Sequence, residues 1–170
     1  MTDDVQHLPP NLAKLGLPRK GADLHADLET IWLTPYMVLT PYVDCCDDLG
    51  IAPFAGGSYL RQGTIAPGFI TSGYRDNIIE GNDRSAHLHA LALDIHVGSI
   101  EKQIAWARVF AGRFMRVGLY PDDTFIHVDQ MPLQWIERYA KTRYWVGRAE
   151  GTGHKYTGFN TLADAIAAAA

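Results

Sequence analysis

The sequence has few cysteines, no dense block of basic residues and no long apolar run, and each absence excludes a class of protein. Its two cysteines, Cys45 and Cys46, are adjacent. A bond between neighbouring cysteines closes a strained ring, so the pair cannot provide the disulfide framework of a small secreted domain. We interpret both residues as buried or bystander thiols.

The charge balance and the apolar segments exclude two further classes. The chain has 15 Lys and Arg against 19 Asp and Glu, a formal net charge of −4, which disfavours a nucleic-acid partner. The most apolar stretch, residues 31–43, is short and contains Pro35 and Pro41, so we expect no membrane span. The N-terminal MTDDVQHLPP lacks the basic start and apolar core of a secretory signal, and from it we expect a cytoplasmic protein.

Length and patterning indicate one compact domain. The chain has 170 residues, of which 47% are hydrophobic, and it shows no internal repeat and no second core. Residues 1–20 are predicted to form an extended lead-in. Residues 23–50 are predicted to form two helical pieces, because Thr34 and Thr40 each precede a proline and are suited to cap a new helix.

The remaining segments predict an α+β fold with one small, largely antiparallel sheet and flanking helices. The helix after Ser99 has apolar residues at spacings of three and four, which are expected to face the core: Ile100, Ile104, Ala107, Ala111 and Phe114. A polar segment, SGYRDNIIEGNDRSAH, separates the first two predicted strands, and long polar loops commonly carry function. We expect strands at 69–71, 90–97, 115–119 and 124–128, and short helices at 132–140 and from 160 to the end.

Three segments carry residues suited to chemistry: SGYR at 72–75, SAHLHALALD at 85–94 and FIHVD at 125–129. Together they supply imidazoles and a carboxylate, the ligand types that a catalytic zinc uses while one position stays open for water. Side chains alternate along a strand, so Asp94 and His127 converge if their strands are neighbours. His89 and His96 repeat the spacing of His87 and Asp94, and spacing alone leaves the choice between them open.

As an ordered set, these segments resemble the zinc D-Ala-D-Ala carboxypeptidases and related murein endopeptidases, whose fold the hedgehog signalling domain shares. The resemblance covers residues 34–145 and includes the RYW at 143–145, which is similar to one bacterial branch. It implies a zinc ion held by His87, Asp94 and His127. On this basis we divide the chain into a lead-in with a first helix (1–33), a peptidase-like domain (34–145) and a C-terminal extension with a short helix (146–170).

The resemblance leaves the general base open. Several members of the family have a carboxylate three residues before the last ligand, where this chain has Thr124. Base catalysis needs a carboxylate close to the water at the zinc. Asp129, on the strand face of His127, is our first choice and Asp123 our second. The alternative for Asp129 is to orient a ligand imidazole.

The resemblance also implies substrate contacts. Arg75 is expected to grip a carboxylate or peptide carbonyl of the substrate, because its planar guanidinium suits a two-pronged hold; the alternative is an ion pair with Asp76 or Asp83. Ser85 and Tyr120 are further candidate substrate-binding residues. Their alternatives are a hydrogen bond within the loop for Ser85 and a place in the wall or core for Tyr120.

The function implied is that of a zinc metallopeptidase that hydrolyses peptide bonds in bacterial peptidoglycan, as a carboxypeptidase or an endopeptidase. Murein lies outside the cytosol, so the expected cytoplasmic location suggests a phage or prophage origin, as a lysis enzyme or as a virion component with phage partners. The alternative function is a zinc-bearing binding or structural module without turnover, which Thr124 at the position of the base would suit.

Overall fold

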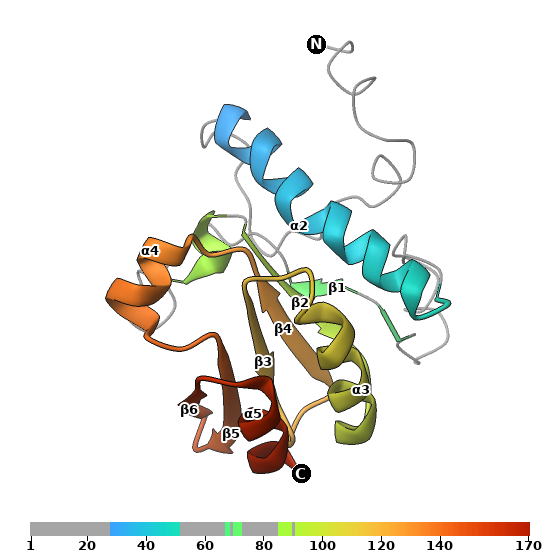
Figure 1. The fold of residues 1–170 in the computed structure, drawn as a ribbon, viewed down its shortest axis with the longest axis vertical. Helices are drawn as coiled ribbons and strands as arrows, with labels where there is room; N and C mark the ends of the chain where they lie inside the picture. Colours follow the sequence, from blue (N-terminus) through green and yellow to red (C-terminus); the bar gives the residue numbers. More distant parts are fainter. Residues whose placement is uncertain (1–27, 52–66, 69, 73–84, 90) are drawn as a thin grey trace.

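The computed structural model describes residues 28–51, 67–68, 70–72, 85–89 and 91–170, and their centre is a six-stranded sheet (Figure 1). All neighbouring strands are antiparallel except β3 and β5. The predicted fold class, α+β with a largely antiparallel sheet and flanking helices, is therefore confirmed. In chain order the strands are β1 (Ile70–Ser72), β2 (Ala92–His96), β3 (Arg116–Leu119), β4 (Phe125–Asp129), β5 (Tyr144–Glu150) and β6 (Gly153–Phe159), and their order in the sheet is β1-β2-β4-β3-β5-β6.

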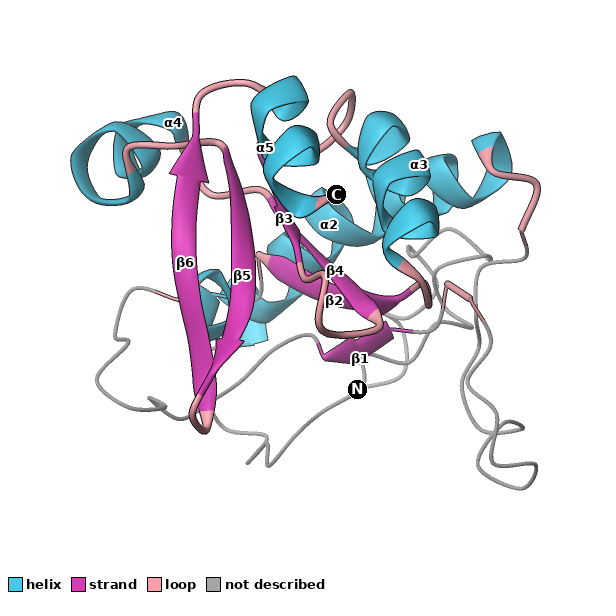
Figure 2. Cartoon of the chain, turned by 90° about the horizontal axis from the view of Figure 1, so that it is seen from below, coloured by secondary structure: helices cyan, strands magenta, loops and turns pink. Residues whose placement is uncertain are grey.

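Three helices cover one face of the sheet, as Figure 2 shows from below: α2 (Leu28–Asp48), α3 (Ile100–Phe110) and α5 (Leu162–Ala169). Alternate residues of the central strands point into this layer, among them Leu93, Ile95, Ile126 and Val128, which are fully buried. The intervening residues therefore point to the other face. That face is flanked by three short helical turns, η3 (Ala86–His89), α4 (Leu133–Trp135) and the π-helical η4 (Ile136–Ala140).

Two predicted helical pieces prove to be one helix. The two prolines at 35 and 41 lie inside α2, where each removes a backbone hydrogen-bond donor at a cost of about 3 kcal/mol. This cost is offset because the helix buries a continuous face against the sheet. Both cysteines lie in that face as buried free thiols, as expected. The buried residues are Val38, Leu39, Tyr42, Val43, Cys45 and Cys46.

The buried face of α3 agrees in part with the prediction. Of the expected core-facing residues, Ala107 and Phe114 are buried, and Ile100 and Ala111 are partly buried and pack against the core. The prediction missed Gln103, Trp106 and Phe110, which are also buried. Gln103 is tolerated in the core because loop backbone atoms satisfy its amide. Ser99 stands at the N-cap as expected, but its side chain makes no cap hydrogen bond.

The C-terminal hairpin of β5 and β6 was not predicted. Residues 144–159 carry glycines and charged side chains in place of a clear alternation, and they form two seven-residue strands. The hairpin joins the sheet through β5, which runs parallel to β3. The division of the chain at residues 33 and 145 stays a prediction, and β5 runs across the second boundary. Within the described ranges, no helix has the length and apolar character needed to cross a bilayer.

Candidate metal centre

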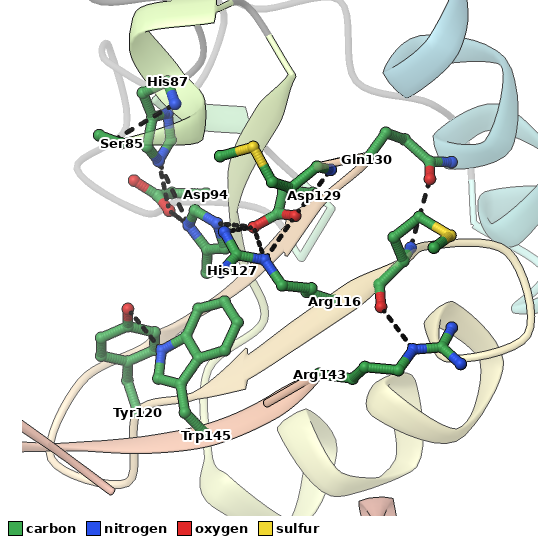
Figure 3. Close-up of polar contacts among 12 residues, drawn as sticks. Ser85, His87, Asp94, Arg116, Tyr120, His127, Asp129, Gln130, Arg143 and Trp145 are labelled. Carbon is green, nitrogen blue, oxygen red and sulfur yellow. Dashed lines mark hydrogen bonds and ion pairs between the residues drawn. The ribbon is translucent and has the colours of Figure 1, made fainter. Parts of the chain in front are cut away.

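The structure brings His87, Asp94 and His127 together on the sheet face opposite α2, α3 and α5 (Figure 3). His87 lies on η3, and its backbone N–H donates to the Ser85 hydroxyl oxygen over 3.4 Å. Asp94 on β2 lies directly opposite His127 on β4, so the two strands are neighbours, which is the condition under which these side chains were expected to converge. Ser85 therefore makes the loop hydrogen bond that we weighed as the alternative to substrate binding.

The distances within this metal group (His87, Asp94 and His127) fit a common cation. His127 Nδ1 lies 2.8 Å from Asp94 Oδ1 and 3.2 Å from His87 Nε2, and His87 Nε2 lies 3.3 Å from Asp94 Oδ1. Two atoms each about 2.0–2.1 Å from a zinc ion at a tetrahedral angle are about 3.3 Å apart. Two of the three separations match this spacing and the third, at 2.8 Å, is shorter, so the three residues form a group that could hold a metal ion.

Both ring nitrogens of His127 face a carboxylate. His127 Nε2 lies 3.1 Å from Asp129 Oδ2, and Nδ1 lies 2.8 Å from Asp94 Oδ1. Burial alone would raise the pKa of Asp129, but hydrogen bonds from His127 and Arg116 hold it below its usual value, so this carboxylate is an acceptor. Asp94 is an acceptor for the same reason, so a cation bound at Nδ1 would place the proton of a neutral His127 on Nε2, where Asp129 accepts it.

The electrostatics of the metal group favour a positive charge between its members. Burial would lower the pKa of His127, yet hydrogen bonds with Asp129 and Asp94 raise it above the usual value. Burial would likewise raise the pKa of Asp94, and the two imidazoles instead hold it well below its usual range. A lone pair facing a carboxylate oxygen at 2.8 Å is repulsive unless a proton or a metal cation lies between them.

Both carboxylate oxygens of Asp129 are engaged in hydrogen bonds. Its side chain is fully buried, and it accepts from Arg116 Nε over 2.9 and 3.0 Å and from Arg116 Nη2 over 2.6 Å. The backbone N–H of Met131 donates to Oδ1 over 3.0 Å. Of the two roles weighed for Asp129, this arrangement favours orienting the imidazole of His127 over acting as the base.

The second carboxylate, Asp123, is also paired. His154 Nε2 lies 2.6 Å from Asp123 Oδ2, and His154 comes from β6, outside every predicted element. The role of Asp123 as a base stays a prediction, because no described contact joins Asp123 to the metal group. His154 carried no signal in the sequence, since the hairpin that places it there was not foreseen.

Of the alternative ligands His89 and His96 and the expected substrate contact Arg75, the structure describes only the side chain of His96. His96 Nδ1 bonds with the Thr124 hydroxyl at 3.1 Å, and His96 is not part of the metal group. The side chain of His89 and the segment with Arg75, Asp76 and Asp83 lie outside the described residues, so the substrate grip by Arg75 stays a prediction.

Trp145 and Tyr120 form a wall beside the metal group. The ring centroids of His127 and Trp145 are 5.1 Å apart, and Arg116 lies over the indole at 5.3 Å. Trp145 Nε1 donates to the Tyr120 hydroxyl oxygen over 3.2 Å. A Cβ on Gly118 would lie 2.3 Å from the indole, so the glycine is what allows Trp145 to lie flat on the sheet.

Gln103, on the opposite face of the sheet, forms hydrogen bonds that stabilise the backbone around Tyr120. Its side chain is fully buried, and its Nε2 donates to the carbonyl oxygens of Tyr120 and Asp123 over 2.9 and 2.8 Å. The backbone N–H of Tyr120 donates to Gln103 Oε1 over 2.9 Å. All three bonds fix the 120–123 turn. The sequence signal for this contact was Gln103 itself, a polar residue three positions after the apolar Ile100 of the predicted helix.

No protein-family model, no curated protein and no solved structure matches the chain. The geometry of the site therefore carries the functional argument.

Proposed function

We propose that the protein is a zinc-dependent peptidase that hydrolyses peptide bonds of bacterial peptidoglycan. The observation that carries the proposal is the triangle of donor atoms from His87, Asp94 and His127, with sides of 2.8 to 3.3 Å. Two imidazoles and one carboxylate are the donor set of hydrolytic zinc sites, which keep a position for water or substrate. The order of the surrounding motifs adds the resemblance to cell-wall peptidases.

Zinc, when bound at these residues, supplies a Lewis acid that polarises a carbonyl and makes water a better nucleophile. The chain's own residues hold and shield that site. Asp129, backed by Arg116, keeps the proton of His127 on Nε2 and the ring in one orientation. Trp145 and Tyr120 exclude water on the side toward β5, and Arg75 is assigned to the substrate.

Metal analysis combined with a digest of purified peptidoglycan tests this proposal. We expect one zinc ion per chain, new amino groups released from murein, and loss of both after chelation or in His127→Ala. His96→Ala is the matched control, because His96 is a neighbouring histidine of the same sheet face outside the metal group. Cleavage that persists in zinc-free protein would contradict the proposal.

The second candidate is a zinc-bearing module that binds murein or another protein without cleaving it. It is favoured by Thr124 at the family's base position and by the commitment of Asp129 to Arg116 and His127. Full zinc content together with no amine release from any murein preparation would select this candidate. A phage or prophage setting stays a prediction under either function.

A further inference from the structure

A row of aromatic side chains continues from the metal group across the sheet to β6. It begins at Trp145, whose ring lies beside His127, and passes to Tyr120 through the hydrogen bond from the indole. It ends at Tyr156 and His154, whose ring centroids lie 6.3 and 5.1 Å from that of Tyr120. We call these four residues, Trp145, Tyr120, Tyr156 and His154, the aromatic row.

Glycines beneath the row let its rings lie close to the sheet. A Cβ on Gly147 would lie 2.7 Å from the ring of Tyr120 and 3.2 Å from that of Tyr156, as Gly118 does beneath Trp145. Side chains at these positions would lift the rings off the sheet. With glycine there, the rings lie close to the backbone. Tyr120 is buried, and its ring is nearly perpendicular to those of Tyr156 and His154, at 83° and 88°. The planes of Tyr156 and His154 differ by only 38°.

The far end of the aromatic row is open to solvent. Tyr156 is 60% exposed, and within the described part of the chain only Met37 and Leu133 are also large, apolar and exposed. Both of those residues belong to helices, α2 and α4. The part of the row that solvent reaches is therefore the ring of Tyr156 together with the partly exposed ring of His154, whose centroid lies 6.1 Å away.

The polar atoms along the aromatic row are neutral or already compensated. They are two tyrosine hydroxyls, an indole N–H and an imidazole that bonds with Asp123 at 2.6 Å. Burial raises the pKa of Tyr120 well above its usual value, so its hydroxyl stays neutral. The charged side chains of the hairpin near the row are paired: Arg148 with Asp122 of the 120–123 turn at 3.6 Å, and Lys155 with Glu150 at 3.9 Å.

The exposed end of the row, Tyr156 with His154 beside it, suits a neutral ligand with flat C–H faces and several hydroxyl or amide groups. Aromatic rings receive the C–H faces, while hydroxyl and imidazole groups exchange hydrogen bonds at the rim. A peptide carboxylate or ammonium group would require a charged partner, which the row does not offer.

We propose that the aromatic row is a saccharide-binding subsite, so that the protein acts on stem peptides that are still joined to the glycan strand. This inference deepens the proposed function and rests on it for the identity of the substrate. Tyr156 is the exposed contact of the subsite, and Gly147 and Gly118 set the depth at which its rings lie.

A titration with a saccharide alone tests the subsite without any peptidase activity. The probe is a β-1,4-linked tetramer of N-acetylglucosamine, followed by tryptophan fluorescence of the zinc-loaded protein. We expect saturable binding that Tyr156→Ala weakens about three- to tenfold, the loss typical of one aromatic stacking contact. Met37→Ala is the matched control and leaves binding unchanged, since Met37 is a similarly exposed apolar side chain on α2.

A second experiment compares two substrates with the same scissile bonds: glycan-linked peptidoglycan fragments and cross-linked stem peptides freed of sugar. In Tyr156→Ala, we expect KM for the glycan-linked substrate to rise relative to KM for the sugar-free peptide, with kcat changed far less. Tyr156→Phe keeps the ring, so we expect its KM for the glycan-linked substrate to lie close to that of the wild type.

Three outcomes would overturn the saccharide subsite: no binding of the tetramer by the wild-type protein below about 10 mM, equal binding by wild type and Tyr156→Ala, or an equal rise of both KM values. The last outcome would make the stem peptide the occupant of the row. Absence of cleavage of either substrate would end the proposed peptidase function, and the saccharide titration would still decide the fate of the subsite.

Discussion

Arg116 and Asp129 form a two-pronged ion pair between directly opposite positions of β3 and β4, with the guanidinium 2.6 to 3.0 Å from the carboxylate oxygens. The pair lies behind His127 on the same sheet face, and Arg116 also lies over the indole of Trp145. One buried pair thus supports a metal ligand on one side and the wall of the site on the other.

Removal of the guanidinium is expected to destabilise the fold. Arg116→Met leaves the buried Asp129 carboxylate without its cationic partner, which typically costs about 3–5 kcal/mol. Urea unfolding of the zinc-free protein measures this cost. Arg148→Met is the control, since Arg148 pairs with Asp122 at the surface, at 3.6 Å, and its loss should cost about 1 kcal/mol or less. Equal losses in the two variants would contradict the structural role of Arg116.

Asp129→Asn distinguishes the two roles of this carboxylate. If Asp129 orients His127, the variant weakens the hold on the proton at Nε2, and zinc affinity falls about 10- to 100-fold. If Asp129 were only a base, activity would fall with zinc affinity unchanged. Competition with a fluorescent chelator measures the affinity, and Asp123→Asn, whose carboxylate bonds with His154, is the control that keeps it.

Much of the metal group could be predicted from the sequence because strands fix geometry. Asp94 and His127 lie in segments that alternate clearly, and the turn at 121–124 sets the register of the hairpin from β3 to β4. The same register places Arg116 opposite Asp129, so this ion pair could also have been predicted from the sequence. Identification of His87 needed the family resemblance, since spacing alone also allowed His89.

The rest depended on contacts between distant segments. His154 and Tyr156 reach the site only because β5 pairs with β3 in parallel, after a connection through α4 and η4. No local pattern shows such a pairing. The two helices predicted at 23–50 were wrong for a related reason, because the burial of α2 against the sheet outweighs the local preference of Pro35 and Pro41.

Gly118→Ala is expected to damage the site more than a surface glycine change does. The added methyl would lie 2.3 to 2.6 Å from three indole atoms of Trp145, so the ring must move away from its place beside His127. Overpacking of this kind typically costs about 1–3 kcal/mol. A lower melting temperature and an altered tryptophan fluorescence should accompany a loss of peptidase activity. Gly153→Ala is the control, because a Cβ at Gly153 meets nothing within 4 Å, and similar effects in both variants would refute the packing argument.

The two buried thiols predict a loss of stability at alkaline pH. Burial raises the pKa of Cys45 to about 12 and that of Cys46 to about 11. A thiol in the unfolded chain has a pKa of about 8.5. Above that pH the unfolded chain releases thiol protons that the folded protein retains, so the free energy of unfolding falls as pH rises, by up to about 1.4 kcal/mol per pH unit for each thiol. Below about pH 8 this contribution is fully present and constant.

The double variant Cys45→Ala, Cys46→Ala isolates this effect. Urea unfolding under reducing conditions, measured from pH 7 to about pH 10.5, should show a steep alkaline fall for the wild type and a shallower one for the variant. Lysines and tyrosines titrate in both proteins, so the difference between the two slopes belongs to the thiols. Cys45 and Cys46 should also resist a thiol reagent at pH 8 until the protein unfolds, since both side chains are buried and protonated. Parallel alkaline slopes, or rapid labelling of the folded protein, would mean that the face of α2 that carries the cysteines is not packed against the sheet as the structure shows.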